Sequence, residues 1–334
     1  MKAVQMIGIG DISNLRLVDI PEPEIVKPNQ IKVQIAAAGI NPIDTKIRQK
    51  GLFYGEKPPA ILGCDGAGIV TQVGEAVTRF QPGDQVWFCH GGLGREPGNY
   101  AEFSILDEHR AEFSPAKIPL TQAAAAPLVL ITAWEALYDR GKLQSGQTVL
   151  IHGGAGGVGH VAIQLAKIRG ARVVTTVSNE QKANFVRTIG ADEVINYKTQ
   201  SVEEEIAKLT QKRGVDLVLD TVGGDVFRQS LSVCAEYGTL VTILDPGDAL
   251  VSTEARNKNL TIAFTLMLTP ALKDLSYALA QQGKILRLCG EWMSEGKLQV
   301  RVSQTFPLSA VAEAHGVIEN GHSQGKIAIV ISDH

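Results

Sequence analysis

The sequence has few cysteines, no long apolar run and no excess of basic residues, and each absence excludes a class of protein. Its 4 cysteines among 334 residues form no Cys-x-x-Cys pair, which argues against a disulfide-rich secreted scaffold and suits a reducing compartment. A net charge of −3 provides no basic footprint for nucleic acid or for an anionic membrane surface. Apolar runs such as 123–131 are too short to span a bilayer, and the first residues lack the apolar stretch of a signal peptide. We therefore expect a cytoplasmic protein that binds neither nucleic acid nor membrane.

A glycine-rich turn between a strand pattern and a helix pattern organises the rest of the chain. The apolar run at 149–151 is typical of a buried parallel strand, and a helix pattern follows the turn. Between them, Gly154-x-Gly156-x-x-Gly159 matches the dinucleotide fingerprint, whose glycines permit a tight turn, a close approach to a pyrophosphate and packing of the helix on the strand. Because a helix start presents free N–H groups and a positive dipole, we expect cofactor binding by Gly154, Ala155, Gly156, Gly157 and Val158. A glycine-rich connection without a ligand is the alternative.

The pattern of predicted secondary structure changes near residue 121. Before it, short strand patterns are broken by prolines and other turn residues; after it, strand and helix patterns alternate as far as residue 244. This alternation predicts a doubly wound parallel sheet. The last segment again has strand patterns, and we expect these strands to pair with the N-terminal half. The predicted fold class is therefore α/β, with a discontinuous β-rich domain (1–122 and 271–334) around a Rossmann domain (123–270).

The tip of the second predicted strand indicates which dinucleotide is bound. An NAD site has a carboxylate about twenty residues past the glycines, whereas the segment 174–179 contains none. Ser178 supplies a hydroxyl there, Lys182 a cation one helical turn later, and Tyr197 follows the third strand. One cation at about 4 Å from a 2′-phosphate would gain on the order of 4 kcal/mol before desolvation is subtracted. We therefore predict NADPH as the cofactor, with a merely solvated Lys182 as the alternative.

Several motifs give the chain a resemblance to the medium-chain dehydrogenase/reductase superfamily, specifically to its zinc-free quinone oxidoreductase (zeta-crystallin-like) branch. Besides the glycine turn they are AGINPID at 38–44, PAILGCDGAGIV at 59–70, APL at 126–128 with TAW at 132–134, GAD at 190–192 and GKI at 325–327. The resemblance covers essentially the whole chain. It implies a GroES-like β-rich catalytic domain plus a Rossmann domain, with the nicotinamide in the cleft between them. It also implies a homodimer or homotetramer, with the strand near 260–264 as a contact.

Zinc alcohol dehydrogenases share this fold, so the metal ligands need separate consideration. A catalytic zinc needs three protein ligands and an open position. The resemblance places Asn41 where that branch has a cysteine, and Cys64-Asp65 where it has a His-Glu pair. Asn41 is a poor zinc ligand, and the region of the structural zinc lobe contains only Cys89. We therefore predict no bound metal.

Individual site residues follow from the resemblance. It implies that Asn41 lies near the nicotinamide ribose and the substrate, where its amide can donate to a carbonyl oxygen, although capping of the turn before Pro42 is the alternative. Tyr54, in a loop that lines the cleft in similar enzymes, can orient the substrate or deliver a proton; a loop tyrosine without a role is equally compatible. The further expected cofactor contacts are Thr132, Leu244 and Phe264 at the nicotinamide and Lys326 at a phosphate. A Thr132 that only satisfies the helix backbone, and a Lys326 that is a surface lysine at the start of a strand, are the alternatives.

The expected function is an NADPH-dependent, zinc-independent reduction of quinones or of α,β-unsaturated carbonyl compounds (enones and enals). Both acceptors delocalise the developing charge onto oxygen, so hydride delivery beside a hydrogen-bond donor suffices. A zinc-dependent alcohol dehydrogenase and a non-catalytic NADPH-binding protein with a structural or regulatory role are the alternatives. Sequence alone does not separate a quinone from an enone.

Overall fold

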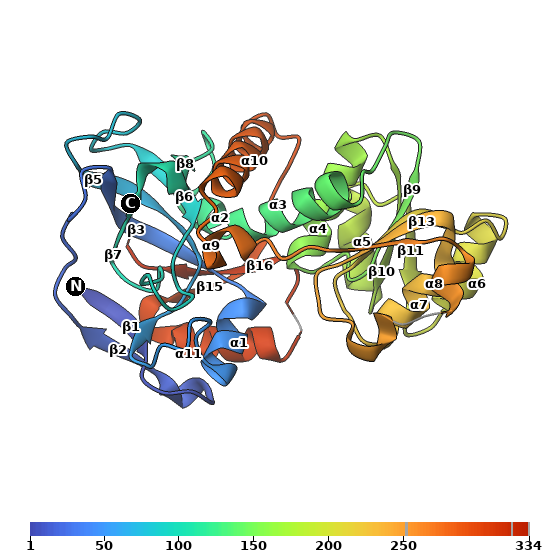
Figure 1. Cartoon of the computed structure of the whole chain (residues 1–334), viewed down its shortest axis with the longest axis horizontal. Coiled ribbons are helices and arrows are strands. Elements are labelled where there is room, and N and C mark those ends of the chain that lie inside the picture. The colour runs from blue at the N-terminus through green and yellow to red at the C-terminus, as the bar shows by residue number, and fades with distance from the viewer. Residues whose placement is uncertain (251–252, 322, 333–334) are drawn as a thin grey trace. The chain divides into compact units, whose positions relative to one another are not determined.

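The computed structural model describes residues 1–250, 253–321 and 323–332 and contains two compact units (Figure 1). One unit comprises Met1–Leu128 together with Leu268–His334, and the other comprises Val129–Met267. The chain therefore leaves the first unit once and returns to it. The domain boundaries expected from the sequence stay a prediction, because compactness does not show which segments would fold on their own.

The unit Val129–Met267 is built on a parallel sheet of 6 strands in the order β11-β10-β9-β12-β13-β14. The strands are β9 (Thr148–Ile151), β10 (Arg172–Val177), β11 (Glu193–Asn196), β12 (Val215–Asp220), β13 (Cys234–Thr242) and β14 (Thr261–Phe264). The helices are α3 (Pro127–Trp134), which enters from the first unit, α4 (Gly157–Ile168), α5 (Glu180–Thr188), α6 (Val202–Leu209), α7 (Asp225–Val233) and α8 (Thr253–Asn257). This is the doubly wound Rossmann sheet that the alternating pattern predicted.

Apolar side chains on one face of this sheet make its core with α6, α7 and α8. Leu150, Val218 and Leu240 from three neighbouring strands pack against Ile206 of α6 and Phe227 of α7. Each fully buried side chain of this kind contributes about 1.5–3 kcal/mol relative to exposure. These strands are rich in β-branched residues and apolar on both faces, because helices cover a parallel sheet on both sides.

The other unit contains two sheets. The larger, of 7 strands, has the order β15-β16-β3-β5-β6-β8, with β7 also paired to β3, and the smaller has the order β2-β1-β4. The strands are β1 (Lys2–Met6), β2 (Leu15–Asp19), β3 (Gln30–Ile40), β4 (Ala60–Ile61), β5 (Asp65–Val73), β6 (Gln85–Cys89), β7 (Phe103–Asp107), β8 (Ala111–Phe113), β15 (Val302–Pro307) and β16 (Lys326–Val330). The helices are α1 (Pro42–Lys50), α2 (Leu120–Ala124), α9 (Thr269–Leu272), α10 (Ser276–Ser294) and α11 (Val311–Glu319).

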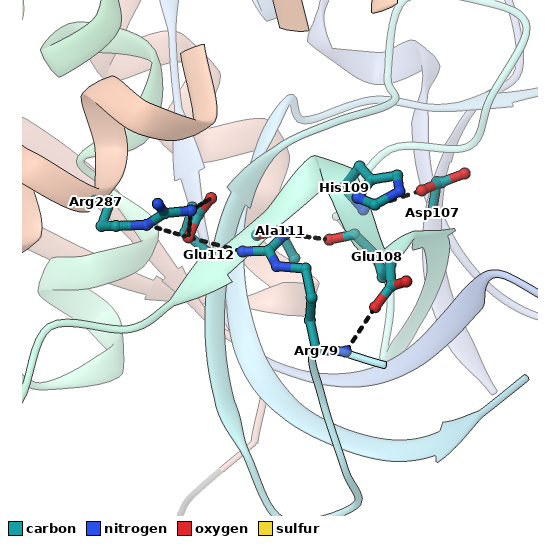
Figure 2. A network of polar contacts seen from close by, with 7 residues as sticks. All are labelled: Arg79, Asp107, Glu108, His109, Ala111, Glu112 and Arg287. Atoms are coloured by element: carbon teal, nitrogen blue, oxygen red, sulfur yellow. Dashed lines mark hydrogen bonds and ion pairs between the residues drawn. The ribbon is translucent and has the colours of Figure 1, made fainter. Parts of the chain in front are cut away.

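The C-terminal segment is an integral part of this β-rich unit, as expected. Strand β16 pairs antiparallel with β3 in the middle of the larger sheet. Helix α10 is tied to β8 by Glu112, whose buried carboxylate accepts hydrogen bonds from Arg79 at 2.9 Å and from Arg287 at 3.0 Å (Figure 2). Arg79 also donates to the carbonyl oxygens of Glu108 and Ala111, so one ionic network links three segments of the chain (Figure 2).

Among the described residues, none of the helices is both long and apolar enough to cross a membrane.

Candidate functional site

The glycine turn lies at the carboxyl end of β9. The chain continues from β9 to β10 on one side of the sheet and later to β12 on the other side, so β9 is next to the topological switch point. Gly153, one position before the fingerprint, has a φ of +65° and is the left-handed residue of the turn. Gly154 is required by close contact instead, because a Cβ there would lie 2.0 Å from Thr175 Oγ1. A Cβ on Gly159 would lie 2.3 Å from the Gly153 carbonyl oxygen. The glycines therefore hold the start of α4 against the strand edge, and the start of a helix in this position is the kind of donor group that binds phosphate.

The three residues expected at the 2′-phosphate come together at the same edge of the sheet. Strands β10 and β11 are parallel neighbours with Val177 opposite Asn196, so Ser178 and Tyr197 follow adjacent strand ends. Asn179 caps α5 by accepting the Lys182 backbone N–H at 2.8 Å, which sets Lys182 in the first helical turn. Tyr197 is 52% exposed. Across the described residues, no carboxylate oxygen lies within 4 Å of Lys182 Nζ, so its charge is available to an anion.

Leu244, one of the residues expected at the nicotinamide, is positioned by an acid that the sequence analysis did not single out. Asp220 is fully buried at the end of β12, where it accepts the backbone N–H groups of Val222 and Gly223 and the Thr242 hydroxyl. The Thr242 hydroxyl in turn contacts the backbone of Leu244 at 3.2 Å. Leu244 therefore follows β13 in a braced turn. In the sequence, the only local signal for this role of Asp220 is an acid at the end of a strand, and an acid in that position is compatible with several roles.

Phe264 and Thr132 are also placed by the fold. Phe264 lies opposite Thr242 on the edge strand β14 and is 49% exposed. Thr132 is buried in α3. The structure thus leaves Phe264 open to a ligand and encloses Thr132 within the helix packing.

In the β-rich unit, strand register gathers polar residues at one end of the larger sheet. Strand β3 ends at Ile40 and β16 begins at Lys326, with Ile40 opposite Ile327. On the other side of β3, Gly39 lies opposite Asp65, which in turn lies opposite Cys89. Three strands of this sheet therefore contribute Lys326, Asp65 and Cys89 to one cluster, which Asn41 joins from the residue directly after β3.

The Asn41 carboxamide lies at the centre of this cluster and is fully buried. Its Nδ2 donates to Asp65 Oδ2 at 2.9 Å, and its Oδ1 accepts a short hydrogen bond from Lys326 Nζ. The ammonium also donates to the Ile40 carbonyl oxygen at 2.7 Å. Both ends of the amide are thus occupied by charged groups, and the Lys326 side chain is turned into the unit rather than toward solvent. Its predicted contact with a phosphate stays a prediction.

Asp44 closes the start of α1 beside Asn41. It accepts the Asn41 backbone N–H at 2.8 Å and the Tyr100 hydroxyl at 3.2 Å, and Cys64 Sγ lies 3.6 Å from its other oxygen. Burial raises the pKa of Asp44 to about 6, although the Asn41 N–H opposes the shift. Burial also raises the pKa of Asp65, and it lowers the pKa of Lys326 against the pull of both carboxylates.

Tyr54 lies in the loop after α1 and is held on two sides. Its hydroxyl donates to the Ala271 carbonyl oxygen at 3.2 Å, and the Arg95 guanidinium carbon lies 4.0 Å from its ring centroid. Burial raises the pKa of Tyr54, so the hydroxyl stays a proton donor at neutral pH. Its predicted roles in orienting the substrate and delivering a proton are not tested by this arrangement and stay predictions.

Two protein families match the two parts of the chain. Residues 27–115 match the alcohol dehydrogenase GroES-like domain, and residues 189–329 match the family described as zinc-binding dehydrogenase.

Curated relatives match the chain over nearly its whole length. The quinone oxidoreductase of Pseudomonas aeruginosa is 33% identical, over 98% of this chain and 99% of that protein. The mitochondrial NAD(P)H oxidoreductase RTN4IP1 of Homo sapiens is 34% identical, over 92% of this chain and 83% of that protein. The 2-haloacrylate reductase of a Burkholderia species is 31% identical, over 91% of both chains.

Solved structures show the same fold. An alcohol dehydrogenase superfamily protein from Novosphingobium aromaticivorans has a TM-score of 0.91 and 37% identity, covering 99% of this chain and 100% of that chain. The quinone oxidoreductase of Escherichia coli, solved in complex with NADPH, has a TM-score of 0.85 and 29% identity over 99% of this chain and 100% of that chain. The predicted fold class and family are thereby confirmed, as is the prediction of an oxidoreductase. The chain belongs to the quinone oxidoreductase branch of the medium-chain dehydrogenase/reductase superfamily.

Proposed function

We propose that this protein reduces quinones or α,β-unsaturated carbonyl compounds by hydride transfer from NADPH, without zinc. The observation that carries the proposal is the carboxyl edge of the parallel sheet, where the glycine turn lies near a cation without a carboxylate partner. The glycine turn would hold the pyrophosphate, and Ser178, Lys182 and Tyr197 the 2′-phosphate. The NADPH complex of the E. coli relative supports this cofactor.

The donor set around Asn41 does not fit zinc. Lys326 Nζ already occupies Asn41 Oδ1, and a second cation on that oxygen would be repelled. The Cys64 thiol is buried and donates to Asp44 Oδ1 at 3.6 Å, so it already has a hydrogen-bond partner. Within the described part of the chain, no cluster of three His, Cys, Asp or Glu side chains has the arrangement to hold a metal ion. The chemistry of the donors therefore supports a zinc-independent reaction.

Reduction needs a hydride source, a donor for the acceptor oxygen and a proton. Bound NADPH would supply the hydride. Asn41 would donate from Nδ2 to the substrate oxygen, where negative charge develops. Tyr54 would supply a proton or orient the substrate, its hydroxyl leaving the Ala271 carbonyl oxygen to do so. Thr132, Leu244 and Phe264 would contact the nicotinamide.

Two acceptor classes fit this chemistry equally. The P. aeruginosa relative is named for a quinone as its substrate, and the Burkholderia relative for a 2-haloacrylate. Both support a small organic acceptor. We keep quinones and conjugated carbonyl compounds as alternative substrates of one site.

A panel of acceptors tests the proposal. The absorbance of NADPH and of NADH would be followed with a quinone, an enal and an enone as acceptors, and the formation of NADPH and of NADH would be followed with an alcohol plus NADP+ or NAD+, each with and without a zinc chelator. We expect NADPH oxidation with a quinone or a conjugated carbonyl compound, unchanged by the chelator. Preference for NADH would reject the roles proposed for Ser178 and Lys182. Alcohol oxidation that the chelator abolishes would favour the zinc dehydrogenase alternative. NADPH binding without turnover would favour a structural or regulatory role.

We also propose a homodimer or homotetramer in the cytoplasm. Strand β14 is an edge of the parallel sheet, and its last residue, Phe264, and the following Leu266 are about half exposed. An exposed edge strand is a template for pairing with a second copy. Light scattering after size-exclusion chromatography, on the wild type and on Ile262→Pro, tests this: the wild type is expected as an oligomer and the variant as a monomer.

A further inference from the structure

A buried lysine meets the predicted catalytic asparagine although 285 residues separate them. Lys326 is 3% exposed and Asn41 is fully buried. The antiparallel register of β16 on β3 places Ile327 opposite Ile40, so the preceding Lys326 comes opposite Asn41. Burying an ammonium is costly unless it is hydrogen-bonded, which makes its two contacts, to Ile40 and Asn41, informative.

These contacts permit only one orientation of the Asn41 amide. A lysine ammonium has donors and no acceptor, so it selects the amide oxygen. An ionised carboxylate accepts only, so Asp65 selects the amide nitrogen. Rotating the amide by half a turn would set the NH2 group against the ammonium and the oxygen against the carboxylate.

The amide also connects the two charges. Across the described residues, no carboxylate oxygen lies within 4 Å of Lys326 Nζ, so the ammonium has no direct ion pair. Its charge meets that of Asp65 through the Asn41 carboxamide, whose dipole lies between them. In a buried site such a chain of hydrogen bonds polarises its members, which makes the Nδ2 group a stronger donor. One of the two Nδ2 hydrogens is used by Asp65, and the proposed function assigns the other to the substrate oxygen.

We propose that Lys326 is a positioning residue of the reductase site: by holding Asn41 Oδ1, its ammonium fixes and polarises the carboxamide that donates to the substrate oxygen. This inference rests on the proposed function, because it takes Asn41 as the donor. It differs from a phosphate contact in a measurable way. If Lys326 contacted a phosphate, its substitution would lower the affinity for NADPH. If it is a positioning residue, its substitution lowers kcat and leaves that affinity unchanged.

A double-mutant cycle tests the coupling. Lys326→Met keeps the unbranched stem of the side chain and removes the ammonium group, and Asn41→Ala removes the amide. We expect K326M to lower kcat on the order of 30-fold and to change the Kd of NADPH less than threefold. In the N41A background, K326M should lower kcat less than twofold further, since the group through which Lys326 acts is gone. Equal effects of K326M in both backgrounds, or an effect on the NADPH Kd alone, would overturn the proposal.

The matched control is Lys32→Met. Lys32 is also a lysine buried in the larger sheet, at 6% exposure, but its ammonium pairs with Glu22. K32M should cost stability like K326M and leave kcat unchanged. If K32M lowers kcat equally, loss of a buried charge explains the result and the positioning role is rejected.

A measurement on the wild type separates failure of this inference from failure of the proposed function. The Asn41 side-chain NH2 protons, followed by NMR, should exchange slowly with solvent, because both ends of the carboxamide are hydrogen-bonded within the folded unit. Rapid exchange of these protons with solvent would overturn the inference even if K326M does not fold. Absence of wild-type turnover across the acceptor panel would reject the proposed function while this readout still reports on the amide.

Discussion

The backbone N–H of Tyr197 donates to the Val177 carbonyl oxygen at 3.1 Å, which sets Tyr197 beside Ser178 at the ends of adjacent parallel strands. This pairing puts a phenol and a hydroxyl near the first turn of α5, where Lys182 lies. The cofactor specificity that we propose depends on this arrangement.

Lys182→Ala is expected to raise the KM for NADPH on the order of 30-fold, corresponding to about 2 kcal/mol for one partly screened cation. The KM for NADH, which lacks the 2′-phosphate, should change less than threefold. Steady-state kinetics with both cofactors measure this. Lys208→Ala, an exposed lysine of α6 paired with Glu205, is the control and should behave as the wild type. Equal effects of K182A on both cofactors would contradict the assignment.

Ser178→Asp is expected to reverse the preference between the cofactors. A carboxylate at this strand end repels a 2′-phosphate and accepts hydrogen bonds from the free ribose hydroxyls. The ratio of kcat/KM for NADPH over NADH should fall at least tenfold. An unchanged ratio would show that Ser178 does not face the ribose.

Gly154→Ala is expected to destabilise the protein by about 3 kcal/mol, because the new Cβ would lie 2.0 Å from Thr175 Oγ1. NADPH binding should weaken as the turn shifts. Gly316→Ala in α11, where a Cβ meets nothing within 4 Å, is the control and should be neutral or stabilising by about 0.5–1 kcal/mol. Denaturant unfolding followed by circular dichroism compares the two. Similar stabilities of both variants would mean that the turn tolerates a side chain.

Glu112→Gln is expected to lower the free energy of unfolding by about 3 kcal/mol, since it leaves Arg79 and Arg287 without their shared anion. The loss should loosen α10 first, visible as faster hydrogen exchange at 276–294. Glu295→Gln, which breaks an exposed pair with Lys297, should cost less than about 0.5 kcal/mol. If E112Q exchanges like the wild type in α10, the network does not hold that helix.

Asp44 is expected to make stability fall as pH rises between about 4 and 6. Burial raises the pKa of folded Asp44 to about 6 from its ordinary value of 3.8, so the folded state binds this proton more tightly than the unfolded state. Its stabilising contribution is complete below pH 3.8 and is lost as pH rises through 6, by about 3 kcal/mol. Asp44→Asn does not titrate there. The difference in unfolding free energy between the wild type and D44N should therefore shrink or reverse across this window; a constant difference would contradict the shifted pKa.

Much of the site could be predicted locally because the relevant signals lie within one strand-turn-helix unit. The glycine turn, the missing acid at the second strand tip and the cation in the following helix are each read within about thirty residues. The alternation of strand and helix patterns likewise predicted the parallel sheet, because burial on both faces leaves a direct mark on each strand. Roles such as those of Tyr54 and Thr132 stay predictions, since neither the loop of the first nor the burial of the second identifies a ligand.

The family, the parallel sheet and the dinucleotide turn can be inferred from local patterns, because these depend on residue type at short spacing. The folded chain adds that Lys326 lies against Asn41, that Asp65 binds the other end of the amide, and that Asp220 positions the turn at Leu244. These contacts arise from strand register between segments up to 285 residues apart. A shift of one residue in the pairing of β16 with β3 would turn the Lys326 side chain to the opposite face. Local patterns in the sequence do not record that register.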